Sequence, residues 1–221
     1  FRWMREHGIG GAFLQRFVAS TKTARLRAFR DRVLENVEAA SRRHELPWAL
    51  MYDLSGCANE DLARSLPADL RRLRAKRRFG ADPRYLHVGD KPLLGIWGIG
   101  FSDGRKYDMR ACRRLVEELH NEGWALFLGV PFWWRTQERD AVASEEWGVI
   151  LARASVVSPW SVGRYASVKR ARSLVAEQLR RDRAEPTLRP GSAAQLCPVV
   201  FPGFSWHKLT STRAKPGRLD Q

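Results

Sequence analysis

The chain has 221 residues and a formal net charge of +15, from 39 Lys and Arg against 24 Asp and Glu. This length suffices for one large domain with a buried core. No apolar run reaches the roughly 18 to 20 residues of a membrane-spanning helix, so no membrane partner is expected. The absence of CxxC-type spacing argues against a zinc site or a disulfide framework and favours buried free thiols at Cys57, Cys112 and Cys197.

The positive charge is spread over several predicted helices. Arginines cluster at 25–32, 71–74 and 170–183, where they alternate with apolar residues at helical spacing. This pattern is typical of solvated outer helix faces, and no nucleic-acid-reading motif accompanies the charge. We therefore expect no nucleic-acid partner, and a nucleic-acid-binding protein is the least favoured function.

Apolar runs and helical segments alternate along the chain. The apolar runs cover 8–17, 47–56, 91–100, 123–134, 154–160 and 196–206, and helical spacing covers 23–44, 59–77, 109–122, 145–153 and 164–183. Such alternation predicts a parallel sheet, because each parallel connection needs a crossover. We predict one α/β domain of six consecutive β/α units with parallel strands.

Local signals add detail to these elements. Asn59 and Asp108 are expected to be helix N-caps, and Pro67 is expected to break or kink the helix over 59–77. A short strand at 85–88 and a tight turn at Gly89-Asp90 precede the strand over 91–97. The helix over 23–44 carries an apolar stripe of the kind that an outer helix needs, at Leu26, Phe29, Val33, Val37 and Ala40. The helix over 109–122 directs inward Cys112, Leu115, Val116 and Leu119.

Aromatic residues gather where the predicted strands end. Ligands of parallel α/β sheets bind at the carboxyl ends of the strands, so we predict the site there. Aromatic rings at this edge are natural stacking surfaces for the C–H faces of sugars. Any single ring has the alternative of capping the core, but a ligand site is favoured by the set of five, Trp97, Trp133, Trp134, Trp160 and Trp206.

Polar residues at the same strand ends complete the predicted site. Asp53 closes an apolar strand, where an unpaired carboxylate would be costly; it is expected either to bind a sugar hydroxyl or to cap the turn at Ser55-Gly56. His207 is placed to donate to a substrate hydroxyl, and Arg135 joins the predicted substrate-binding set. We expect convergence on one face of the sheet for Asp53, Trp97, Trp133, Trp134, Trp160, Trp206 and His207.

Motifs for cofactors and metals are missing from the sequence. Gly95, Gly98 and Gly100 form no GxGxxG before a helix, and the GxSxG, P-loop and HExxH patterns do not occur. We expect neither a cofactor nor a metal. Glu145 and Glu146 are adjacent, so in a helix their side chains point about 100° apart and form a poor carboxylate pair.

Five segments carry a resemblance to a known family: YDLSG at 52–56, KP at 91–92 leading to IWG at 96–98, VP at 130–131 leading to WWR at 133–135, SPWSVGRY at 158–165 and VVFPGFSWH at 199–207. Together they resemble bacterial glycoside hydrolases of the family 71/99-like group, relatives of endo-α-mannosidase that are often labelled xylosidase or arabinosidase. The resemblance covers essentially the whole chain. It implies a (β/α)8 TIM barrel, of which residues 1–221 form a single incomplete catalytic-type domain, truncated at both ends, with about six of the eight units.

The resemblance also implies glycoside hydrolysis, and it implies that the catalytic carboxylates of the family are missing from this chain. These enzymes hydrolyse glycosidic bonds without a metal, with catalytic carboxylates in a Glu-x-x-Glu-Gly type of motif on the last strand. Hydrolysis needs two carboxyl groups, yet Asp220 is the only carboxylate side chain after Glu185. We expect a glycoside hydrolase-like protein acting on oligo- or polysaccharides, whose catalytic pair lies beyond Gln221 and whose own hydrolysis is at background level. The alternative is a non-catalytic carbohydrate-binding protein. An exported or periplasmic location is compatible with the resemblance.

Overall fold

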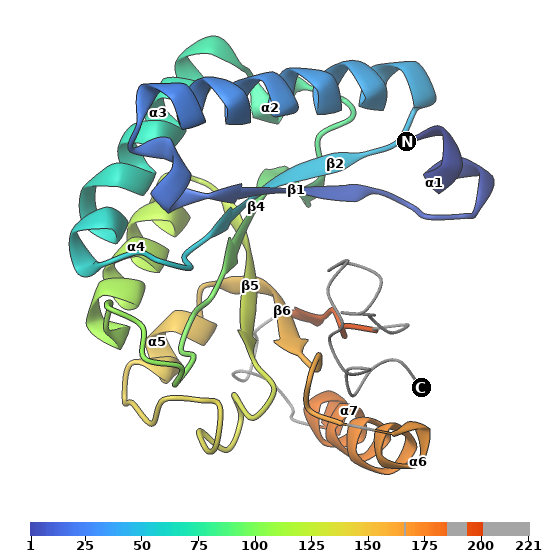
Figure 1. Ribbon diagram of the computed structural model, residues 1–221, viewed down its shortest axis with the longest axis vertical. Helices are drawn as coiled ribbons and strands as arrows, with labels where there is room; N and C mark the ends of the chain where they lie inside the picture. The colour runs from blue at the N-terminus through green and yellow to red at the C-terminus, as the bar shows by residue number, and fades with distance from the viewer. Residues whose placement is uncertain (166, 185–193, 201–221) are drawn as a thin grey trace, which may run out of the picture.

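Six parallel strands form the body of the sheet in the computed structural model, which describes residues 1–165, 167–184 and 194–200 (Figure 1). Strand β3 (His87–Val88) pairs antiparallel with β4 through the predicted turn. The parallel strands are hydrogen-bonded in chain order: β1 (Ala12–Phe17), β2 (Trp48–Asp53), β4 (Lys91–Trp97), β5 (Ala125–Pro131), β6 (Ala154–Trp160) and β7 (Gln195–Leu196). The predicted parallel α/β architecture is confirmed.

Helices connect successive parallel strands, and α2 to α5 surround the convex side of the sheet (Figure 1). The longer helices are α2 (Ala24–His44), α3 (Leu66–Lys76), α4 (Met109–Asn121) and α7 (Ala176–Ala184). Shorter elements are α1 (Arg2–Glu6), α5 (Trp147–Leu151), α6 (Val168–Arg170), the 3-10 turns η1 (Val18–Thr21) and η3 (Phe79–Ala81), and the π-helical turns η2 (Asp61–Ser65) and η4 (Ala171–Val175). No helix in the described part of the chain has the length and apolar character to cross a membrane.

Of the two predicted N-caps, Asp108 is confirmed and Asn59 is wrong. The carboxylate of Asp108 accepts a hydrogen bond from the amide of Ala111 at 2.8 Å, which confirms it as the N-cap of α4. Asn59 is not an N-cap, because its side-chain amide pairs with the carboxylate and backbone amide of Asp108. Pro67 does not break its helix: the π-helical turn η2 precedes it and passes directly into α3. A π turn offers a different hydrogen-bond register, which accommodates the missing N–H of proline.

The sheet curves strongly away from its helices. The ring centroids of Phe13 on β1 and Phe127 on β5 lie 4.5 Å apart. These strands are separated by β2 and β4, so in a flat sheet they would stand about 14 Å apart. Trp97 on β4 and Trp160 on β6 also contact each other across β5. Side chains on the face opposite the helices therefore meet across a concave surface.

The main core lies between the convex face and the helices. Strand β5 is buried along its whole length, as its continuous apolar sequence predicted. From α4, the predicted inward residues Cys112, Leu115, Val116 and Leu119 are all buried. Cys57 is buried as well, but Cys197 is exposed, so the prediction of three buried thiols is wrong there. The short β7 leaves Cys197 just beyond the paired part of the sheet edge.

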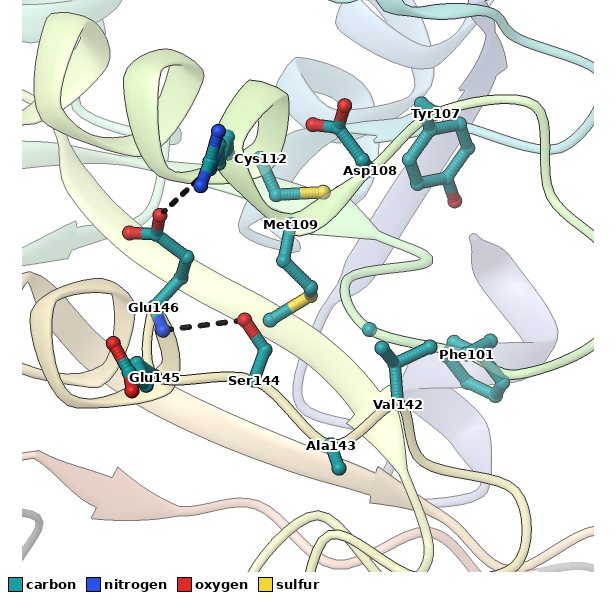
Figure 2. Close-up of a pocket in the computed structure, with 12 residues that line it drawn as sticks. Phe101, Tyr107, Asp108, Met109, Cys112, Val142, Ala143, Ser144, Glu145 and Glu146 are labelled. Atoms are coloured by element: carbon teal, nitrogen blue, oxygen red, sulfur yellow. Dashed lines mark hydrogen bonds and ion pairs between the residues drawn. The ribbon is translucent and has the colours of Figure 1, made fainter.

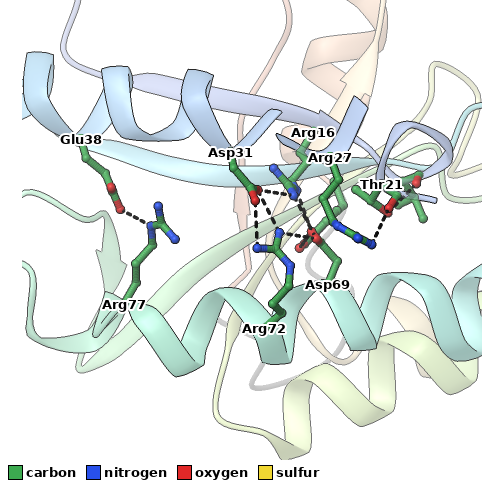
Figure 3. Close-up of polar contacts among 10 residues, drawn as sticks. Arg16, Thr21, Arg27, Asp31, Glu38, Asp69, Arg72 and Arg77 are labelled. Atoms are coloured by element: carbon green, nitrogen blue, oxygen red, sulfur yellow. Dashed lines mark hydrogen bonds and ion pairs between the residues drawn. The ribbon is translucent and has the colours of Figure 1, made fainter. Parts of the chain in front are cut away.

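Helix α2 is rotated relative to the prediction from its apolar stripe. The side chains of Leu26 and Phe29 are 46% and 58% exposed, whereas Leu34 is fully buried. The inward side of this part of the helix carries Asp31, which reaches Arg16 on β1 (Figure 3). The stripe prediction is thus wrong for the first turns of α2, because pairing a buried arginine outweighs the burial of two apolar side chains.

Arg16 is the centre of a buried network of charges (Figure 3). Its side chain is 1% exposed and binds both carboxylate oxygens of Asp69, with the shorter N–O distance 2.6 Å. Arg72 on α3 bridges Asp31 and Asp69 at 2.9 Å, and the Tyr52 hydroxyl donates to Asp69 at 2.7 Å. Burial alone would raise the pKa of Asp69, but the hydrogen bonds from Arg16 and the other donors outweigh it and lower that pKa.

Replacing Arg16 with Met should destabilise the fold by about 3 to 5 kcal/mol, because it leaves the carboxylate of Asp69 buried with an incomplete set of partners. Urea unfolding monitored by circular dichroism measures this loss. The matched control is Arg43→Met on the exposed side of α2, which should change the free energy of unfolding by less than about 0.5 kcal/mol. Equal effects of the two substitutions would contradict the assigned role of Arg16.

Candidate functional site

Three of the predicted site residues lie together on the concave face at the carboxyl ends of the strands. Asp53 at the end of β2 is paired in register with Trp97 at the end of β4. The indole rings of Trp97 and Trp160 contact each other edge to face, with centroids 5.0 Å apart and planes at 76°. Both rings are partly exposed. We call Asp53, Trp97, Trp160 and their neighbour Gln15 the aromatic cluster.

The carboxylate of Asp53 is held in two ways. One oxygen accepts the backbone amide of Ser55 at 2.7 Å, so the turn-capping interpretation is correct. The other oxygen accepts the side-chain amide of Gln15 on β1 at 2.5 Å. Asp53 itself is 3% exposed, while Gln15 is exposed on the concave face. The carboxylate of Asp53 and the amide of Gln15 are thus hydrogen-bonded to each other on the same face of the sheet as the two indole rings.

The position of Trp97 depends on a glycine in the next strand. Gly129 on β5 pairs with Trp97, and a Cβ atom built on Gly129 would lie 2.0 Å from the Trp97 ring. Only glycine lets the indole lie against the β5 backbone and reach Trp160 on the far side. The pairing of Trp97 with Gly129 in the neighbouring strand therefore makes the contact between Trp97 and Trp160 possible.

The loop at 98–108, between β4 and α4, lines three cavities at the rim of the strand ends. The largest, of about 620 Å³, lies between the start of α4 and the segment 142–146 (Figure 2). In it the carboxylate of Glu146 lies 3.8 Å from the guanidinium of Arg110 on α4, and that of Glu145 points elsewhere, so they form no acid–base pair. The buried thiol of Cys112 also lines this cavity, and burial raises its pKa to about 12, which makes it a poor nucleophile.

A second cavity, of about 550 Å³, contains the predicted residue Trp133. We call it the arginine cavity; it is lined by Phe101, Ser102, Asp103, Trp133, Arg139, Asp140, Gly163 and Arg164. The guanidinium carbons of Arg139 and Arg164 lie 4.6 Å and 6.0 Å from the centre of the Trp133 ring. A third cavity of about 260 Å³ adjoins Ser55 and Arg105. All three cavities are lined by loops that follow the carboxyl ends of parallel strands.

Trp134 and Arg135 do not belong to the aromatic cluster. Trp134 is 4% exposed and packs in the core. Arg135 forms an ion pair with Asp182 on α7 at 3.4 Å, where the Asp182 side chain is 1% exposed. Burial raises the pKa of Asp182 to about 6, against the lowering effect of Arg135. These two residues therefore attach α7 to the end of β5. Trp206 and His207 lie outside the described residues.

Sequence reasoning missed Gln15, Arg139 and Arg164. Gln15 interrupts the first apolar run on the same side of the strand as Phe13 and Phe17, and that alternation is a readable signal. The two arginines lie in loops, where no periodicity marks them. In the described part of the chain, no group of three or more His, Cys, Asp or Glu side chains is arranged to hold a metal ion.

Comparison with known proteins does not assign the chain to a family: no family model matches it, and neither the curated proteins nor the solved structures contain a match.

The Gly129→Ala substitution should displace the Trp97 ring, because the added methyl group would overlap it. We expect a loss of about 1 to 3 kcal/mol in the free energy of unfolding and a change in the near-ultraviolet circular dichroism of the Trp97–Trp160 pair. Gly148→Ala is the control, since a Cβ atom there meets nothing within 4 Å. An unchanged spectrum for Gly129→Ala would show that the rings do not depend on this glycine.

Asp182→Asn should stabilise the protein at neutral pH and have little effect near pH 4. The folded protein holds the Asp182 proton more tightly than the unfolded chain, since its pKa is about 6 against an ordinary 3.8. The carboxylate therefore lowers the free energy of unfolding as pH rises through this window. We expect the variant to gain roughly 1 to 2 kcal/mol at pH 7, measured by urea unfolding at both pH values. A difference that is the same at pH 4 and pH 7 would contradict this assignment.

Proposed function

We propose that this chain binds a carbohydrate on the concave face of its sheet, at the carboxyl ends of the strands, in a cleft of the glycoside hydrolase type. The observation that carries the proposal is the aromatic cluster. Two partly exposed indoles at a right-angled contact stand beside the hydrogen-bonded pair of Asp53 and Gln15. Sugars present apolar C–H faces together with hydroxyl groups, so they suit a surface that joins rings to the exposed amide of Gln15, which the buried carboxylate of Asp53 orients.

We further propose that the sheet is part of a (β/α)8 barrel. In doubly wound folds the strand order reverses at a switch point, whereas in a barrel each strand follows its predecessor. Here the parallel strands keep the order of the chain from β1 to β7, and Phe13 meets Phe127 across two intervening strands. Both features support a singly wound, closing sheet, and the resemblance to family 71/99-like glycoside hydrolases adds to that support.

The proposed activity of the described residues is binding of the sugar. Glycoside hydrolysis needs two carboxyl groups on opposite sides of the scissile bond. Among the concave positions of the strands β1 to β6, Asp53 is the only carboxylate. At the rim, Asp103 and Asp140 are engaged by Arg105 and Arg164. In this proposal hydrolysis requires a second carboxyl group beyond these, and a non-catalytic carbohydrate-binding protein is the alternative.

Isothermal titration calorimetry against a panel of neutral manno- and xylo-oligosaccharides tests the proposal. We expect binding by the unmodified chain, and a loss of at least about tenfold in affinity for Trp160→Ala, because one stacking surface is removed. Asp53→Asn should also weaken binding while keeping the turn, since an amide oxygen can still accept from Ser55.

The control is Trp3→Ala, because Trp3 is 71% exposed and lies far from the strand ends, on α1 at the amino-terminal side of β1. It should bind like the unmodified chain. The proposal fails if no member of the panel binds, or if Trp3→Ala and Trp160→Ala weaken binding equally. Hydrolysis of aryl glycosides that disappears in Asp53→Asn would instead show that the chain already contains its catalytic groups.

A further inference from the structure

We propose that the arginine cavity is a subsite for a negatively charged sugar, a uronic acid residue whose carboxylate binds Arg139. The inference rests on the proposed carbohydrate function and specifies its ligand class. The cavity begins immediately beyond β6, which carries Trp160 of the aromatic cluster, and beyond the neighbouring strand β5. Trp133 follows β5 by two residues, and Gly163 and Arg164 follow β6 by three and four residues.

The carboxylates of the arginine cavity are already neutralised. Asp140 accepts the backbone amides of Phe132 and Trp133, both at 3.1 Å, and pairs with Arg164 at 2.7 Å. Asp103 is bound by two nitrogen atoms of Arg105, at 2.8 Å and 3.0 Å. These pairs hold the loops in place and leave no carboxylate of the cavity for Arg139.

Arg139 is the uncompensated charge in this cavity. Within the described residues it takes part in no ion pair, and its guanidinium stands 4.6 Å from the centre of the Trp133 ring. Arg139 is exposed and has a left-handed backbone, with φ of 54°. Non-glycine residues in this conformation are uncommon and concentrate at functional sites. The exposed guanidinium of Arg139 therefore has donors free for a ligand beside an aromatic ring.

A uronic acid matches this combination of groups. Its ring has the apolar faces that the partly exposed ring of Trp133 can contact, and its carboxylate matches the planar fork of a guanidinium. The volume of about 550 Å³ is in the range of small-molecule sites. The formal charge of +15 on the whole chain would also attract a polyanionic glycan over a longer distance. This attraction to the whole chain is distinct from binding at the arginine cavity, so the experiment must distinguish the two contributions to affinity.

The test compares trigalacturonate with its methyl ester by isothermal titration calorimetry, using the full chain. The two probes have the same sugar backbone, and only the acid is charged. We expect the acid to bind at least about tenfold more tightly than the ester, and Arg139→Gln to abolish this preference. Arg139→Lys, which keeps the charge without the fork, should restore part of it. Arg42→Gln is the matched control, because it removes the same charge from the exposed side of α2.

Each other outcome overturns the inference in a distinguishable way. If acid and ester bind equally, the carbohydrate function stands and the anionic subsite does not. If Arg42→Gln and Arg139→Gln weaken the acid equally, and single-stranded DNA competes, the attraction is diffuse charge. If a sulfated trisaccharide binds more tightly than trigalacturonate, the preferred ligand is a sulfated sugar, and the assignment of a uronic acid is wrong. If neither form binds and the neutral panel is also inactive, the carbohydrate function fails together with the subsite.

Discussion

The buried charge of Arg16 is the constraint on which the arrangement of the outer layer depends. A guanidinium in a core must be paired, and its partners come from two different helices, Asp31 on α2 and Asp69 on α3. Meeting this requirement sets the rotation of α2 and leaves Leu26 and Phe29 at the surface. These partners join both helices to the convex face of β1.

The shape of the concave face depends on glycine residues as well as on large side chains. Gly95 and Gly129 leave room for Met51 and Trp97, whose atoms would lie within 3 Å of any Cβ at those positions. The strongly curved sheet then brings rings from alternate strands into contact, as with Trp97 and Trp160. Parallel strands carry all of their carboxyl ends to one edge, so the rings, Asp53 and the rim cavities share one side of the molecule. This common edge is why a single extended ligand is a reasonable occupant.

The rim shows that the arginines of a strongly basic chain differ in how their charge is compensated. Most of its arginines lie in ion pairs or on solvated helices, as the sequence pattern indicated. At the arginine cavity the ion pairs of Arg105 with Asp103 and of Arg164 with Asp140 stabilise loops. The guanidinium of Arg139 pairs with no carboxylate of the described residues. Net charge alone cannot distinguish these roles, because a guanidinium acts as a binding group only where no carboxylate of the protein neutralises it.

The sequence by itself determined the order of strands and helices, the buried strand β5, the N-cap at Asp108 and the edge at which the strand-end residues gather, because all of these follow from local periodicity and chain direction. It did not determine the rotation of α2, the burial of Trp134 or the partners of Asp53 and Asp182. Those features depend on contacts between residues far apart in the chain: Gln15 meets Asp53, Arg16 meets Asp69, and Arg135 meets Asp182. Only the tertiary structure brings such groups together, and the cost of leaving a buried charge unpaired then decides which face of each element turns inward.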